Sequence, residues 1–105
     1  MIVKVTPQNG SVELVDPHAF DGFHVEAPAD ATPSKVSAAL GTAEAGSPSN
    51  DHVWVRVDQV RGLAPAGDAT WSAGFEAMLA YAQGKGWMNA GGDMIMAHLV
   101  AASSG

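Results

Sequence analysis

Two short segments of the sequence alternate polar with apolar residues, and their polar positions carry the side chains best suited to chemistry: His24, Glu26, His52, Trp54 and Arg56. Because successive side chains of a β-strand point to opposite faces, each set shares one face of its strand. The apolar positions between them, mostly valines, are expected to face the core. If the two strands join one sheet, the five polar residues form a single patch.

Such a patch is suited to binding a small molecule. A guanidinium such as that of Arg56 can bind a carboxylate through two hydrogen bonds, and an indole such as that of Trp54 can stack on a flat ring. An imidazole beside a carboxylate can move a proton near neutral pH. The patch therefore predicts a site for a small anionic or aromatic ligand. Alternatively, this face is solvated or is covered by a second copy of the chain, because Trp and Arg are frequent anchors of interfaces.

The segment that leads into His24 holds further residues of metal-binding type, namely Asp16, His18 and Asp21. A mononuclear site of imidazole and carboxylate groups needs about three convergent ligands. The spacing of these residues matches no metal-binding motif, so we expect solvated loop residues and no metal ion. The chain has no Cys, which excludes disulfides, thiolate zinc sites and iron–sulfur clusters.

His98 lies in an apolar stretch, between Ala97 and Leu99. We expect it to be packed in a helix with its ring nitrogens hydrogen-bonded; the alternative is a lone general base in a cleft between that helix and the sheet. Neither a phosphate-binding glycine loop nor the G-x-S-x-G elbow of serine hydrolases occurs in the sequence. The sequence therefore predicts no nucleotide cofactor and no serine triad.

The elements that must position these residues begin with a β-hairpin. Residues 2–6 and 11–15 are rich in β-branched side chains, and the Asn9-Gly10 pair between them tolerates the positive φ angles of a tight turn. A third strand is expected over residues 22–27, where polar and apolar residues alternate.

A short helix is predicted between Thr32 and Gly41, because a hydroxyl cap followed by Pro is typical of a helix start and Gly of a helix end. Residues 42–51 are small and polar and predict a surface loop. The strand over residues 52–57 is then expected to switch to a helix capped by Asp58.

The dominant helix is predicted over residues 70–85. Its apolar positions have helical spacing and form one stripe: Trp71, Phe75, Met78, Leu79 and Ala82. A last short helix is expected over residues 94–101, which are apolar nearly all round.

Strands that come early and helices that come late predict a two-layer α+β domain over residues 1–105. We expect about four strands in a mainly antiparallel sheet that begins with the hairpin. The long helix should pack across one face of this sheet, against Val53, Val55 and Val57, together with the short helices.

Composition limits the partners. Five basic residues against eleven acidic ones give a net charge of −6 without a basic cluster, so we expect neither nucleic acid nor an anionic membrane surface as a partner. With 47% hydrophobic and 15% charged residues, the chain is typical of a globular protein and not of a disordered one. We expect a cytoplasmic location, because the sequence has neither a membrane-spanning apolar stretch nor a signal-peptide block.

The leading functional hypothesis is a non-catalytic protein that works as a homo-oligomer or as an accessory subunit, because so small a chain leaves apolar surface uncovered. One alternative is a metal-independent isomerase or lyase, with His52 or His24 as base and Arg56 as anion clamp. Another is a carrier or sensor of a small molecule that uses the same patch.

Overall fold

The computed structural model describes residues 1–20, 23–46 and 51–101. In this part of the chain, five strands form one mixed sheet in the order β2-β1-β3-β5-β4. The bounds are β1 (Ile2–Thr6), β2 (Ser11–Val15), β3 (His24–Ala27), β4 (His52–Arg56) and β5 (Met94–Ala101). The central strands β1, β3 and β5 run parallel, and β2 and β4 pair antiparallel at the two edges. The predicted α+β class is confirmed, whereas the expectation of about four mainly antiparallel strands is wrong.

The helices are α1 (Pro33–Leu40), the 3₁₀ turn η2 (Ala43–Ala45), α2 (Val57–Leu63) and α3 (Ala69–Gly84). The caps expected for the first helix are present, whereas the expected cap by Asp58 is wrong: α2 begins at Val57, so Asp58 lies within its first turn, and no side chain caps this helix. Thr32 caps α1, because its hydroxyl accepts a hydrogen bond from the backbone N–H of Lys35 at 3.3 Å. Gly41 ends the helix at φ 75°, a left-handed conformation that side chains with a Cβ rarely adopt. The helix predicted between these two residues is thus confirmed.

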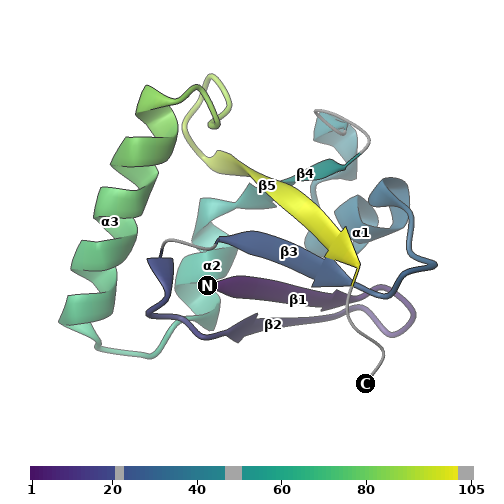
Figure 1. Ribbon diagram of the computed structural model, residues 1–105, viewed down its shortest axis with the longest axis horizontal. Coiled ribbons are helices and arrows are strands. Elements are labelled where there is room, and N and C mark those ends of the chain that lie inside the picture. The colour runs from purple at the N-terminus through teal and green to yellow at the C-terminus, as the bar shows by residue number, and fades with distance from the viewer. Residues whose placement is uncertain (21–22, 47–50, 102–105) are drawn as a thin grey trace.

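The core lies on one face of the sheet. Val3, Val25 and Val55 are each fully buried there, and Val36 of α1 and Val60 of α2 belong to the same buried cluster. In Figure 1, α1 and α2 lie behind the sheet, and the opposite face is turned toward the viewer. Burial of each such side chain contributes about 1.5–3 kcal/mol before the loss of entropy is subtracted.

The segment predicted as the last helix is the strand β5. Its residues 94–98 pair with β4, and residues 99–101 pair with β3 on the other side, so every residue of the strand has a partner in a neighbouring strand. Ile95 and Ala97 are 2% exposed and point into the core. A short apolar run is compatible with either a buried strand or a helix. Here the strand forms because β3 and β4 both provide backbone hydrogen-bond partners for it.

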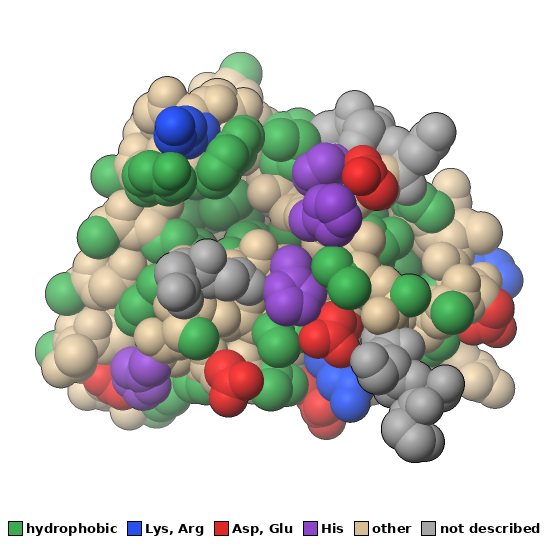
Figure 2. Space-filling view, viewed as in Figure 1, with side chains coloured by type: hydrophobic (Ala, Val, Ile, Leu, Met, Phe, Trp, Pro, Cys, Tyr) green, Lys and Arg blue, Asp and Glu red, His purple; other side chains and the backbone are tan. Residues whose placement is uncertain are grey.

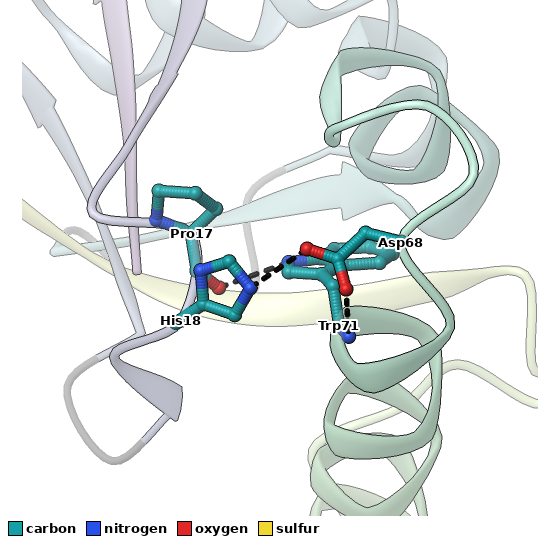
Figure 3. A network of polar contacts seen from close by, with 4 residues as sticks. All are labelled: Pro17, His18, Asp68 and Trp71. Carbon is teal, nitrogen blue, oxygen red and sulfur yellow. Dashed lines mark hydrogen bonds and ion pairs between the residues drawn. The ribbon is translucent and has the colours of Figure 1, made fainter.

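α3 is anchored at its amino-terminal end. Asp68 caps the helix, because its Oδ1 accepts a hydrogen bond from the backbone N–H of Trp71 at 2.9 Å, and its Oδ2 lies 2.9 Å from Nε2 of His18 (Figure 3). The hydrogen bond from Trp71, followed by the interaction with His18, lowers the pKa of Asp68. The indole Nε1 of Trp71 donates to the carbonyl of Pro17 at 2.9 Å. These contacts join the start of α3 to the loop after β2.

The stripe of α3 is apolar as predicted, but the helix does not lie across the sheet. Trp71 and Phe75 are buried in the common core, and their rings stack with centroids 4.7 Å apart. In Figure 1, α3 stands beside the sheet, next to the ends at which β1, β3 and β5 begin. The expectation that α3 packs across the sheet face is therefore wrong, and the helices that cover this face are α1 and α2.

No helix in the described ranges is long and apolar enough to span a membrane.

Candidate functional site

The structure places the five residues of the predicted patch on one face of the sheet, opposite the core. In the β4–β5 ladder, His52, Trp54 and Arg56 stand opposite alternate residues of β5, and Glu26 of β3 stands opposite Val100. Residues that pair across neighbouring strands point to the same face. The valines between them are buried, so the alternation of the two segments predicted the facing of these side chains.

The five residues do not line one hollow. Arg56 is turned toward the end of α1, where its Nε donates to the carbonyl of Gly41 at 3.4 Å and its guanidinium lies 3.6 Å from the carboxylate of Glu44. His24 and Glu26 contact each other, with Nε2 and Oε2 3.2 Å apart. The arrangement in which Arg56 holds an anion beside His52 or His24 therefore has no support in the geometry.

Three histidines instead align across the middle of this face. His52 of β4 pairs with His98 of β5, and their ring centroids lie 5.0 Å apart in an edge-to-face arrangement. The parallel β3–β5 ladder begins with Val25 opposite Leu99, so one step back along both strands His24 stands level with His98. We call these three residues the histidine row. Figure 2 shows histidine side chains gathered near the middle of the face, with acidic side chains beside them.

His98 was predicted to be packed in a helix, and this expectation is wrong. Its side chain is exposed on β5. No alternation of polar and apolar residues in the sequence over residues 94–101 could have placed it, because this run is apolar except for His98. The alternation is seen only in the structure, where Ile95 and Ala97 are buried and His98 is exposed.

A hollow of about 860 Å³ lies between α3 and the sheet, and we call it the α3 hollow. The sheet contributes His52, Ile95, Met96 and His98. The helix contributes Gly74, Ala77, Met78, Tyr81 and Ala82. The connecting segments contribute Phe20, Phe23 and Trp87.

The lining of the α3 hollow is mainly apolar, with two imidazoles at the side of the sheet. Tyr81 and Trp87 are unusually exposed for aromatic residues, at 60% and 40%, and their rings meet edge to face at 5.8 Å. The Lys85 ammonium lies 5.5 Å from the centroid of the Tyr81 ring. An apolar hollow with a few polar groups at one end is the usual form of a small-molecule site.

The residues of metal-binding type before β3 do not come together in the described part of the chain. His18 pairs with Asp68 and His24 with Glu26, and Asp21 lies outside the described residues. A different group does converge. Asp51, His52 and His98 each offer one ligand atom, and these atoms lie within 4.8 Å of one another. The sequence pattern does not indicate this group, because the apolar run around His98 predicts a helix, whereas the residue lies on β5.

Comparisons with models of protein families, with curated proteins and with solved structures find no match to this chain.

Proposed function

We propose that this protein binds a small, flat and mainly apolar molecule in the α3 hollow. The observation that carries the proposal is the hollow itself, whose volume of about 860 Å³ falls in the range of roughly 300–1,000 Å³ typical of small-molecule sites. Aromatic rings and the flexible thioethers of Met78 and Met96 line it. Such side chains accommodate a flat ring, because aromatic faces stack and methionine adapts its shape.

The ligand should carry one polar or anionic group. His52 and His98 supply the imidazoles of the lining, and both lie on the side of the sheet. Each can donate a hydrogen bond from a ring N–H, and a protonated imidazole also attracts an anion. The opposite wall, formed by α3, offers mostly apolar contacts. The two walls thus favour a molecule with an apolar ring and a polar edge.

Binding without chemistry agrees best with this arrangement. The isomerase or lyase hypothesis needs Arg56 as an anion clamp beside a histidine base, but Arg56 contacts Gly41 and Glu44 and does not line the hollow. A carrier or sensor needs only the fit of the ligand. This favours the small-molecule carrier over the enzyme.

The test uses 2-naphthoate as an anionic aromatic probe, added to the full chain in the presence of EDTA. Ala77→Phe places a ring in the hollow from a helix position whose own side chain is exposed. Ala80→Phe is the matched control, because Ala80 is also exposed on α3 but does not line the hollow. We expect the wild type and Ala80→Phe to bind with similar affinity and Ala77→Phe to lose binding, measured by calorimetry or by the rise in melting temperature.

Equal binding of 2-naphthoate by Ala77→Phe and Ala80→Phe would place the probe elsewhere and contradict the proposal. Absence of binding to the wild type across a panel of aromatic acids, phenols and neutral aromatic compounds would do the same. Amide chemical shifts of the wild type give a second readout, and we expect the largest changes along α3 and β5.

A homodimer is the second candidate function. Its support is the exposure of Tyr81 at 60% and Trp87 at 40%, because exposed aromatic rings are enriched where proteins associate. In a dimer these rings would be covered by a second copy. Sedimentation at micromolar concentration distinguishes the two candidates: a particle of 10.7 kDa contradicts the dimer, whereas a species of twice that mass that dissociates in Trp87→Ser supports it.

A further inference from the structure

The cluster of Asp51, His52 and His98 has the composition of a metal site, and it goes beyond the proposed binding of an organic ligand. His52 and His98 are direct partners in the antiparallel ladder, so their side chains leave neighbouring strands on the same face. Asp51 comes immediately before β4, and its backbone carbonyl accepts a hydrogen bond from the N–H of Leu99 at 2.6 Å. This bond fixes the start of β4 against β5, next to His98.

The donor atoms are close enough to converge on one ion. Asp51 Oδ1 lies 2.8 Å from His52 Nδ1, and the imidazole centroids of His52 and His98 are 5.0 Å apart. One ligand atom from each residue falls within a span of 4.8 Å. Bonds of about 2.0–2.1 Å to a tetrahedral ion place its ligands roughly 3.4 Å apart. Side-chain rotations that move the ligand atoms by about 1 Å would therefore bring all three within bonding distance of one ion. The side chain of Asp51 is 60% exposed, which leaves it room to rotate.

The ligand types select the class of ion. Two imidazole nitrogens and one carboxylate oxygen suit zinc and the neighbouring transition metals, whereas magnesium and calcium prefer oxygen ligands throughout. Three protein ligands leave one position on a four-coordinate ion for water or another molecule. His52 and His98 also line the α3 hollow, so that position would be close to it.

Elsewhere in the molecule, a similar pair lacks the third ligand. His18 Nε2 lies 2.9 Å from Asp68 Oδ2, a geometry close to that of His52 with Asp51. Among the described residues, Asp51, His52 and His98 are the only group of three or more His, Cys, Asp or Glu residues whose ligand atoms converge. His18 therefore provides an internal control for the effect of a lone His–Asp pair.

We propose that Asp51, His52 and His98 bind one divalent transition-metal ion, with Zn²⁺ as the expected ion, on the open face of the sheet. The proposal concerns the protein without any organic ligand. It therefore stands or falls separately from the binding of 2-naphthoate, which is measured in EDTA.

The experiment titrates Zn²⁺ into the full chain, from which metal has been removed with EDTA and the EDTA then dialysed away. Calorimetry should give one ion bound per chain for the wild type and for His18→Ala, and no binding of Mg²⁺. For His52→Ala and for His98→Ala the affinity should fall by more than about 100-fold, because loss of even an outer partner of a metal ligand costs roughly 10–100-fold. Asp51→Asn should lower it by about 10–100-fold or more.

Histidine side-chain NMR spectra supply a readout that a merely structural role would not change. Addition of Zn²⁺ should shift the ring signals of His52 and His98 and leave those of His18 in place. Melting curves recorded without metal show whether each variant is folded, and His98→Gln replaces His98→Ala if the latter unfolds. The proposal is overturned if the wild type binds no Zn²⁺, or if His18→Ala weakens binding as much as His98→Ala does.

Discussion

The two halves of α3 differ in how firmly they are packed against the rest of the protein, although they belong to one helix. The first half is closely held: Trp71 and Phe75 are buried, Asp68 caps the first turn, and the Trp71 indole is hydrogen-bonded to Pro17. The second half, which ends at Gly84, supplies most of the α3 residues that line the hollow, including Tyr81, which is 60% exposed. The difference shows how a small domain can present a binding wall. One half of the helix is anchored in the core, and the other half extends from that anchor with Met78, Leu79 and Tyr81 only partly covered, although Ala82 is buried.

Among substitutions that test this difference between the two halves, we expect the largest loss of stability at Phe75. Phe75 is fully buried and stacks on Trp71, so Phe75→Ala leaves a cavity in the common core. We expect a loss of about 3–5 kcal/mol in the free energy of unfolding, measured by urea denaturation. Met78→Ala, one turn later and only partly buried, should cost clearly less. If the two variants lose equal stability, the two halves of α3 do not differ as described.

A smaller effect is expected at Gly74, which lies in the first half of α3 between Trp71 and Phe75 and also lines the α3 hollow. A Cβ at this position would lie 2.3 Å from Cε2 of the Phe20 ring, whereas a Cβ at Gly84, near the end of the same helix, has no heavy atom within 4 Å. Gly74→Ala must therefore displace Phe20, which lines the α3 hollow, at a cost of about 1–3 kcal/mol. Gly84→Ala should instead stabilise the protein by about 0.4–1 kcal/mol, because alanine restricts the unfolded chain.

These two glycine variants are best compared by urea denaturation and by affinity for 2-naphthoate. We expect Gly74→Ala to change both quantities and Gly84→Ala to change only stability. Equal stabilisation by the two alanines would mean that Phe20 moves aside without cost, and the close packing of Phe20 against Gly74 would then not define the wall of the hollow.

The same contrast explains what the sequence could predict. The hairpin, α1 and α3 follow from turn residues, caps and apolar spacing, all of which act within a few neighbouring residues. The apolar stripe of α3 was likewise visible. Its partner was not, because periodicity shows which side of a helix is apolar and says nothing of the surface that this side meets. Gly74 is a further example. The absence of a side chain at this position matters because the Phe20 ring packs against it, and Phe20 is remote in sequence.

The candidate site depended even more on contacts between remote segments. The alternation around His52 predicted that its side chain faces away from the core, and the burial of Val53 and Val55 agrees. The partner of His52 is His98, and that pairing exists only because β5 enters the sheet between β3 and β4. An eight-residue run of apolar residues does not by itself distinguish a helix from a strand. Because residues 94–101 were predicted to form a helix and not β5, neither the α3 hollow nor the cluster of Asp51, His52 and His98 could be predicted.

The smallest expected effect concerns the charge at the anchored end of α3. Asp68 has a pKa below its ordinary value of 3.8, chiefly because the backbone N–H of Trp71 donates to its carboxylate. A carboxyl group whose pKa is lower in the folded than in the unfolded protein stabilises the fold above the unfolded value and loses this contribution as the pH falls through the folded value. Asp68→Asn keeps a capping side chain, because Asn and Asp cap helices about equally well, but removes the charge.

The variant Asp68→Asn should therefore be slightly less stable than the wild type at neutral pH, since a negative charge is favourable at a helix amino terminus. Water and salt screen this partly exposed group, so the difference should be small. Urea midpoints of both proteins, measured from neutral pH to below 3.8, should converge as Asp68 becomes protonated in the wild type. A difference that stays constant over this range would show that the charge of Asp68 does not stabilise the first half of α3, which would then be held by the uncharged cap and by the packing of Trp71 and Phe75.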